Sequence, residues 1–295
     1  MKDQIVIADA LHGEVRIHAA CTTSLVEEAR QHHHCMPTSI AALGRTMTVT
    51  AIMASDLKNQ NERVQAVLNG KGPIGTVLAQ ADGAGNVKGF AANPNVYIVR
   101  EDGHLAVGQG IGTNGTLTVT RDMGLKEPFT GTSALQSGEV GDDFAYYFAI
   151  SEQVPSVVGV GVLVSQEGSV KASGGLIYQL LPKAGEEAIE YCEKVAKTQK
   201  PVSELIDEGK DLDEIIQMYF PDANILARRD VRFHCGCSKE HFMDSLVTLH
   251  DNDLKEMIED GKGAEIVCQY CNTTYNFTVE ELKEILERKH CVENR

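Results

Sequence analysis

The chain has 295 residues, a length that suits two domains and allows one of them to bury a full apolar core. Its apolar content of 42% is typical of a globular protein, and its formal net charge of −15 argues against nucleic acid or an anionic membrane as a partner, because phosphate groups bind to positive surfaces. Asp3 and Asp9 interrupt the first apolar stretch, unlike in a signal peptide, and the longest apolar run, 154–165, is shorter than a membrane span. We therefore expect a cytoplasmic protein.

Residues 1–181 are predicted to form a core domain of the α+β class. Residues 13–21 alternate apolar and polar side chains, as a half-buried strand does. A capped helix is predicted from Thr22, and a second, buried helix is predicted over 37–58, which is apolar on several faces. Short strands follow, separated by turn sequences such as DGAGN, TNG and SQEG, so the sheet should consist mainly of antiparallel hairpins.

Residues 182–231 are predicted to form an acidic helical linker. Three short amphipathic segments occur there, AGEEAIEYCEKVAK, VSELIDEG and DLDEIIQMYF. Helices of this length are marginal alone, so their order should depend on docking against another part of the protein. The apolar residues expected to make that contact are Ile189, Val195, Leu205, Ile206, Leu212, Ile215, Ile216, Tyr219 and Phe220.

Residues 232–295 are predicted to form a small zinc-binding domain. Its four candidate ligands follow the pattern C-x-C, thirty intervening residues, C-x-x-C, and they are Cys235, Cys237, Cys268 and Cys271. In a reducing cytoplasm, clustered cysteines are metal ligands or redox elements rather than structural disulfides. Four thiolates suit a tetrahedral zinc ion and leave no open coordination position.

The core expected for this small domain is thin. It offers Phe233, Phe242, Phe277 and a few aliphatic side chains, whereas zinc binding by small Cys-rich domains contributes on the order of 10–16 kcal/mol. Removal of the metal should therefore unfold the domain. A terminal helix is also predicted, opened by a capping box between Thr278 and Glu281.

The two close cysteine pairs leave two interpretations open. One is a redox-inert structural zinc site. In the other, oxidation expels the metal and each pair closes on itself; a disulfide across one residue lies near the limit of acceptable Cα separation and should be easily reduced. Gly236 lets the backbone bend there, and Gly236→Val is expected to leave zinc binding largely intact while hindering that disulfide.

Several other motifs are expected to have structural roles and to bind no ligand. The glycines of 108–115 miss the dinucleotide-binding spacing and predict hairpin turns. Histidines at 32–34 suit the dipole at a helix end, Asp142 and Asp143 suit the start of a helix predicted over 142–153, and His234 suits the surface or an indirect contact with the metal site. The cysteines predicted to be unligated are Cys21, Cys35, Cys192 and Cys291, of which Cys291 is the most open to chance reaction.

Two other functions fit the sequence less well. A zinc-ribbon nucleic-acid-binding protein would surround its metal with basic residues, but 231–295 hold 8 basic against 13 acidic side chains. A disulfide reductase would place C-x-x-C between a strand and a helix, without a metal. A catalytic nucleophile motif is not evident, so we expect a protein that is not an enzyme.

RFHCGCSKE and VCQYCNTTY, preceded by the acidic helical segment, resemble the redox-regulated thirty-three-kilodalton heat-shock chaperone family. Further matching segments are ALGRTMTVTAIMAS, GPIGTVLAQAD, NPNV, GTNGTLTV, GDDFAYYFAISEQVPS and GGLIYQLLP. The resemblance covers nearly the whole chain in the same order, and the spacing of the four cysteines is specific to it.

The resemblance implies a redox-regulated molecular chaperone. In the reduced, inactive form, Cys235, Cys237, Cys268 and Cys271 would hold one zinc ion per chain. Peroxide or hypochlorous acid, together with unfolding stress, would form the disulfides Cys235–Cys237 and Cys268–Cys271, release zinc and loosen the linker. The active homodimer would then bind unfolding proteins without ATP and prevent their aggregation. It would later pass them to the ATP-dependent seventy-kilodalton chaperone system.

Overall fold

The computed structural model describes residues 1–293, with side chains through residue 289. They form two compact units, the first ending at His234 and the second beginning at Cys235. Within this part of the chain, no helix has both the length and the apolar character needed to cross a bilayer. Each unit is described below by itself.

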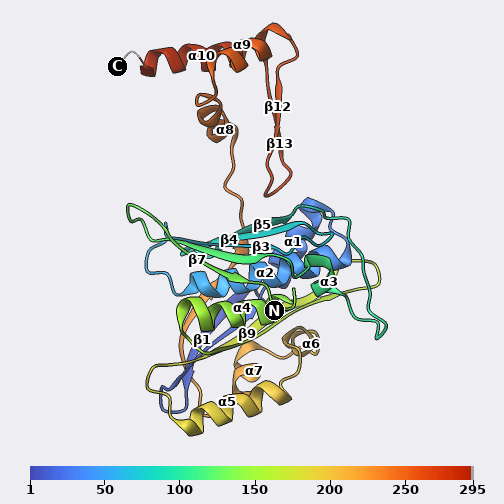
Figure 1. Cartoon of the computed structure of the whole chain (residues 1–295), viewed down its shortest axis with the longest axis vertical. Coiled ribbons are helices and arrows are strands. Elements are labelled where there is room, and N and C mark those ends of the chain that lie inside the picture. Colours follow the sequence, from blue (N-terminus) through green and yellow to red (C-terminus); the bar gives the residue numbers. More distant parts are fainter. Residues whose placement is uncertain (294–295) are drawn as a thin grey trace. The chain divides into compact units, whose positions relative to one another are not determined.

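The first unit contains two sheets that alternate with layers of helices (Figure 1). Neighbouring strands of the first sheet are all antiparallel, which agrees with the predicted α+β class. In spatial order this sheet contains β10 (Asn224–Asp230), β1 (Gln4–Ala10), β2 (Val15–Cys21), β9 (Val170–Leu180) and β8 (Ser156–Val164). The strand expected within 13–21 is therefore confirmed as β2.

The second sheet is mainly a series of antiparallel strands joined by turns, as predicted. Only its edge strand β11 runs parallel to its neighbour, β5. In spatial order this sheet contains β11 (Arg232–Phe233), β5 (Asn86–Ala91), β4 (Thr76–Asp82), β3 (Arg63–Asn69), β6 (Thr116–Asp122) and β7 (Phe129–Ala134). The DGAGN turn joins β4 to β5, where Asp82 accepts hydrogen bonds from the backbone of Ala84 and Asn86.

Helix α2 (Pro37–Ser55) lies between the two sheets, as Figure 1 shows. It is buried along nearly its whole length, which confirms the prediction of a buried helix over 37–58. Thr46, Thr48 and Thr50 satisfy their hydroxyl groups by donating to the carbonyls four residues earlier, at 2.7–2.8 Å. Polar side chains can therefore occupy the apolar interior without leaving unpaired donors.

Helix α1 (Thr23–His33) begins where it was predicted, but Thr22 does not cap it. The Thr22 hydroxyl instead contacts the hydroxyl groups of Thr48 and Ser173 at 2.8 and 2.9 Å. The cap comes from buried Asp3, whose carboxylate accepts hydrogen bonds from the N–H groups of the second and third helical residues, at 3.2 and 2.6 Å. Burial raises the pKa of Asp3, although these two hydrogen bonds oppose that shift.

The glycine-rich segment 108–115 differs from the prediction of hairpin turns. Its first residues belong to the short helix α3 (Val107–Ile111), and β6 follows as expected. The backbone packs too closely for side chains here: a Cβ atom on Gly70 would lie 2.0 Å from the carbonyl oxygen of Gly112. The glycines thus serve backbone packing, a requirement that a search for phosphate-binding spacing does not reveal.

The helix predicted over 142–153 has two parts. They are α4 (Val140–Tyr147) and the π-helical turn η1 (Phe148–Glu152). Asp142 and Asp143 lie in the first turn, where their charge suits the positive end of the helix dipole. Their interpretation as helix-start residues is confirmed.

The three amphipathic segments of the expected linker form helices within the first unit. They are α5 (Glu186–Thr198), α6 (Val202–Asp207) and α7 (Leu212–Tyr219), and they cover the face of the first sheet that points away from α2 (Figure 1). Nearly all the apolar residues expected at this contact pack there, but Ile189 does not, with 40% of it exposed. The segment ends in strand β10, which the helical prediction missed.

The second unit is small and has a small apolar core. Its elements are α8 (Lys239–Leu246), α9 (Asp251–Glu259), β12 (Ala264–Val267), β13 (Thr274–Phe277) and α10 (Val279–Glu293). Among its described side chains, the buried core residues are Leu246, Leu254, Phe277, Leu282 and Ile285. Phe233 was wrongly assigned to this core: it lies in β11 of the first unit and stacks on His32, with 5.0 Å between the ring centroids.

The predicted capping box opens α10. The hydroxyl of Thr278 accepts from the N–H of Glu281 at 3.2 Å, and the Glu281 carboxylate accepts from the N–H of Thr278 at 2.9 Å. Both of these N–H groups lack a helical partner, so the two reciprocal bonds stabilise the start of the helix.

Candidate metal centre

Two separate segments of the second unit supply the four cysteines. Cys235 and Cys237 lie on the extended chain before α8, and Cys268 and Cys271 lie in the turn that joins β12 to β13. The turn is fixed by two backbone hydrogen bonds, from Cys268 N–H to the carbonyl of Thr273 at 3.0 Å and from Asn272 N–H to the carbonyl of Cys268 at 2.8 Å. The hairpin therefore presents its two sulfur atoms on one side of a short loop.

The structure brings all four sulfur atoms together. The Sγ atoms lie within 4.8 Å of one another, and the shortest distances are 3.4 Å for Cys235–Cys268 and 3.4 Å for Cys237–Cys271. Zinc–sulfur bonds of about 2.3 Å in a regular tetrahedron separate the sulfur atoms by about 3.8 Å. The four thiols thus match the size and the donor chemistry of a tetrahedral zinc site.

Tyr275 and Thr273 line this cluster, and the sequence interpretation missed both. The Tyr275 hydroxyl lies 3.1 Å from Cys237 Sγ, and it also donates to the Cys237 carbonyl at 3.2 Å. The Thr273 hydroxyl lies 3.2 Å from Cys271 Sγ. Groups that hydrogen-bond to ligand sulfurs tune metal affinity, and the position of these two immediately after C-x-x-C was the available signal.

Cys235, Cys237 and Cys271 have different surroundings, which shift the pKa values of their thiols in different directions. Burial raises the pKa of both Cys235 and Cys237, and the neighbouring thiol of Cys268 adds to the rise at Cys235. Burial also acts to raise the pKa of Cys271, but the hydroxyl and backbone N–H of Thr273, with the adjacent thiols, outweigh it and lower the value to about 7. One sulfur of the cluster is thus stabilised as a thiolate, the form that binds metals.

Gly236 has a backbone conformation that the sequence interpretation did not anticipate. Its φ angle is +67°, in the left-handed region, while the cysteines on both sides face the cluster. A β-branched residue is strained in this region. The glycine therefore favours the closed cluster itself, and the expectation that Gly236→Val leaves zinc binding largely intact is replaced by the expectation that it weakens zinc binding.

The histidines predicted to lie outside the metal site do so. His33 is buried, with its Nε2 atom 3.0 Å from the carbonyl oxygen of Gly89, and His34 ends α1 in the left-handed conformation. His234 is exposed, and its backbone N–H donates to the carbonyl of Val87. Among the side chains that the structure describes, these histidines belong to no metal-binding group.

Three of the remaining cysteines are reduced and buried. They are Cys21, Cys35 and Cys192. Burial raises the pKa of all three thiols, to about 12 for Cys35 and about 11 for Cys192. Their prediction as unligated cysteines agrees with these surroundings, because none of the three belongs to a metal-binding group of the described side chains. Cys291 lies outside the described side chains.

Comparison with known proteins agrees with this arrangement. The sequence model of the Hsp33 protein family matches residues 3–278. The 33 kDa chaperonin of Bacillus pumilus is 45% identical over 287 residues, which cover 97% of this chain and 98% of that protein. The 33 kDa chaperonin of Staphylococcus carnosus is 43% identical over 289 residues, with 97% and 98% covered.

A solved structure agrees as well. The crystal structure of the 33 kDa chaperonin of Thermotoga maritima, a heat shock protein 33 homolog, superimposes with a TM-score of 0.90 at 35% identity, over 99% of this chain and 100% of that one. The likeness thus extends over both units, including the segment that carries the four cysteines. The chain belongs to the Hsp33 family.

Proposed function

We propose that this protein is an ATP-independent chaperone whose activity is controlled by oxidation of its cysteine cluster. In the reduced state, Cys235, Cys237, Cys268 and Cys271 would hold one zinc ion, and the chaperone would be inactive. In the oxidised state, Cys235–Cys237 and Cys268–Cys271 disulfides would replace the cluster. The protein would then bind unfolding proteins and prevent their aggregation. The family to which the chain belongs supports the chaperone activity itself.

The observation that carries the redox control is the position of the cluster in its unit. Four sulfurs lie within 4.8 Å of one another, in a unit whose described apolar core has few buried side chains. A metal held by the four cysteines would crosslink the chain before α8 to the β12–β13 turn. Because most apolar side chains packed in this unit are only partly buried, we expect the unit to unfold when such a crosslink is lost.

Oxidation of each cysteine pair to a disulfide requires one oxidant molecule that accepts two electrons. Two cysteine sulfurs lose two electrons and form one sulfur–sulfur bond, while the oxygen–oxygen bond of a peroxide breaks and its oxygens leave as two water molecules. With hypochlorous acid the products are water, chloride and a proton. Disulfide sulfurs no longer offer the thiolates that a metal site needs. The single residue between Cys235 and Cys237 favours a disulfide that reductants reverse easily.

The helices α5, α6 and α7 connect the metal centre to the chaperone activity in this proposal. They are short and strongly charged on their outer faces, and they stay ordered by packing their apolar faces against the first sheet. Unfolding of the second unit would loosen them and uncover apolar surface for an unfolding protein. We place this activity in the cytoplasm and in a homodimer that hands its clients to an ATP-dependent chaperone system.

A paired measurement tests the proposed function. Zinc release is followed with a chromogenic chelator during peroxide treatment, and aggregation of a heat-denatured client is followed by light scattering. The oxidised, zinc-free protein should suppress aggregation, and the reduced, zinc-loaded protein should not. Equal suppression by both forms would leave a purely structural zinc site as the better interpretation.

The Cys268→Ser variant adds a second test. It should bind zinc more weakly and make the second unit sensitive to protease even in reductant, because a cluster with three thiolates closes less firmly. The matched control is Cys35→Ser, since Cys35 is buried in the first unit and lies outside the cluster. Unchanged protease resistance of Cys268→Ser would contradict the role of the cluster.

A further inference from the structure

Strand β10 covers an edge of the first sheet that would otherwise be open. It pairs with β1 from Gln4–Asp230 to Asp9–Asn224, with an irregularity in register between Ile7 and Ala8. The other side of β1 is occupied by β2. Without β10, the backbone N–H and carbonyl groups of β1 on that side would lack partners, which makes the edge a template for another extended chain.

The side chains of β10 contribute little to holding it in place. Its side chains are exposed or only partly buried: Leu226 is 47% exposed, and Ile225 packs against the core without being fully covered. Its ion pair with the N-terminal segment, Lys2–Asp230 at 2.7 Å, joins two groups that are 70% and 72% exposed, so water screens most of the attraction. The strand is therefore attached mainly through its backbone.

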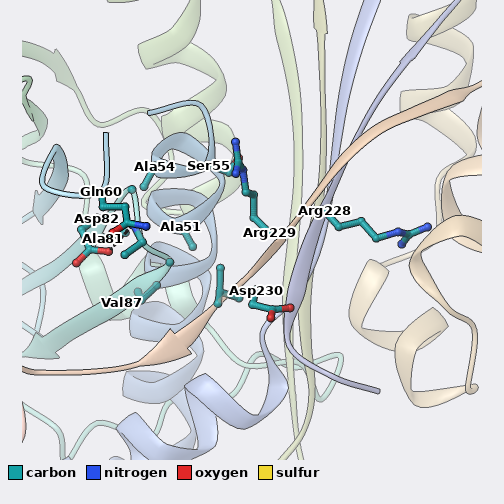
Figure 2. Close-up of a pocket in the computed structure, with 14 residues that line it drawn as sticks. Ala51, Ala54, Ser55, Gln60, Ala81, Asp82, Val87, Arg228, Arg229 and Asp230 are labelled. Atoms are coloured by element: carbon teal, nitrogen blue, oxygen red, sulfur yellow. Dashed lines mark hydrogen bonds between the residues drawn. The ribbon is translucent and has the colours of Figure 1, made fainter. Parts of the chain in front are cut away.

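One flank of β10 borders a cavity instead of a packed core. The cavity measures about 250 Å³, and residues 228–231 line it together with the end of α2 and the β4–β5 turn (Figure 2). The side chain of Arg229 extends toward Ser55 on this flank, whereas Arg228 points to the opposite side of the strand. There Arg228 pairs with Asp213 of α7 at 2.6 Å, so β10 is connected to the helical layer.

Strand β1 contrasts with β10 in the burial of its side chains. Ile5, Val6, Ile7 and Ala8 are all buried, and the first three are β-branched residues that favour extended structure. Strand β1 is thus held firmly by its own side chains, while β10 adds only the partly buried Ile225 to the same core. An edge occupied in this way recognises the backbone of an extended chain and tolerates many sequences, as strand addition does in peptide-binding domains.

We propose that the β1 edge, residues 5–9, is a binding surface for extended apolar segments of unfolding proteins, and that β10 covers it in the inactive state. This inference rests on the proposed function, because oxidation must first loosen the helices to which β10 is connected. Displacement of β10 then exposes the β1 backbone, and a client segment replaces β10 by strand pairing. The proposal accounts for broad client specificity without a shaped pocket.

A crosslink between the two strands tests this surface. Gln4 and Asp230 are direct partners across the antiparallel pair, so Gln4→Cys combined with Asp230→Cys allows a disulfide that holds β10 on β1. The matched control is Gln4→Ser combined with Asp230→Ser, which removes the same side chains without a crosslink. Peptide mass spectrometry verifies the crosslink, and zinc release shows that the switch itself still works.

The expected result is that the crosslinked protein releases zinc normally but loses aggregation suppression, down to the level of reduced wild type. The serine control should retain suppression. Full suppression by the crosslinked protein would overturn the β1 surface while leaving the chaperone function intact. Failure of oxidised wild type to suppress aggregation would instead overturn the proposed function.

Hydrogen exchange on wild-type protein provides a test that needs no variant to fold. The backbone amides of residues 5–9 that point toward β10 should be protected in the reduced form, exchange faster after oxidation, and regain protection when a denatured client is added. Protection that persists after oxidation without client would overturn the proposal. A crosslink between a Gln4→Cys chain and an Asp230→Cys chain would do the same, because β10 of a second copy would then occupy the edge.

Discussion

Gly236 lies between two cysteines of the cluster, and this position constrains its backbone. Its neighbours must both turn their sulfur atoms toward the same centre, and the backbone meets this demand with a φ angle of +67°. For an L-residue this conformation costs roughly 1–2 kcal/mol, and β-branched residues tolerate it least. The glycine therefore contributes to the closed cluster as well as to any later disulfide.

Gly236→Val should weaken zinc binding by about tenfold, because valine is strained in the left-handed conformation that residue 236 adopts in the closed cluster and is free of this strain when the cluster is open. Competition with a chromogenic chelator measures this change. Gly236→Asn is the matched control, because asparagine occupies the left-handed region more readily than valine, and it should lose less affinity. Equal zinc affinity for the valine variant and wild type would show that the cluster forms without this conformation.

Glu27 shows how one carboxylate can join two elements of the first unit. It accepts hydrogen bonds from Arg30 at 2.7 and 2.8 Å and from the backbone N–H of Val170 at 2.8 Å, so it ties α1 to β9. The Arg30 hydrogen bond is the main cause that lowers the pKa of Glu27 from 4.5 to about 2. Because the folded state holds the charged form, the stabilisation is present above pH 4.5 and is lost as the pH falls toward 2.

Glu27→Gln should therefore lower the free energy of unfolding at neutral pH, and its effect should shrink as the pH falls to about 3. Urea unfolding of metal-free protein measures this, since acid release of a metal then plays no part. Glu28→Gln is the control: that side chain is 53% exposed, and its removal should change little at either pH. An equal loss for Glu27→Gln at both pH values would rule out the charge as the cause.

Short helices in this chain depend on their ends. Asp211 and Glu214 form a capping box at the start of α7, with bonds of 2.8 and 2.9 Å, and Thr278 and Glu281 form the equivalent box at α10. Helix α7 has only 8 residues, so the cap satisfies a large share of its unpaired N–H groups. Its stability then comes from this cap and from docking.

Asp211→Ala should destabilise α7 by about 1 kcal/mol and speed hydrogen exchange of its amides in the reduced, zinc-loaded protein. Thr278→Ala removes the other cap and should act on α10 alone, so each variant serves as the control for the other. If either substitution speeded exchange equally in both helices, the effect would be global unfolding rather than loss of a local cap.

The elements that the sequence predicted correctly are those with a regular apolar period. Helices α2, α5 and α7 and strand β2 each bury a face or a repeat that side-chain spacing reveals. Strand β10 was missed because its side chains are exposed or only partly buried, so no clear apolar period marks it, and its order comes mainly from backbone pairing with β1. Strand β11 has two residues, too few for any pattern.

The same distinction between sequence pattern and tertiary contact applies to the candidate metal site. Spacing alone predicted which four cysteines converge, because C-x-C and C-x-x-C each place two sulfurs on a short turn. The contacts of Tyr275 and Thr273 with the sulfurs depend on the β12–β13 hairpin, which had not been predicted. Likewise, Asp3 caps a helix that begins twenty residues later, a contact that only the tertiary fold creates.

At the scale of the whole molecule, the layer of α5, α6 and α7 is the part that the proposed function requires to move. Cys192 lies in α5 on the buried side, with 4% of it exposed, among the residues that contact the first sheet. Cys35 is equally buried, but it follows α1 and lies outside this contact. The two thiols therefore distinguish movement of the helical layer from general unfolding.

Oxidation and zinc release should make Cys192 reactive toward iodoacetamide while Cys35 stays protected. Burial raises the pKa of Cys192 to about 11, so undocking of α5 both opens the thiol to the reagent and returns its pKa toward the ordinary value, which increases the reactive thiolate. Peptide mass spectrometry after timed alkylation reports each cysteine separately. Equal labelling of Cys192 in the reduced and oxidised forms would mean that the layer stays docked. Parallel labelling of Cys35 would mean that the first unit also opens between α1 and α2, and the active state would then not be a folded core with a released helical layer.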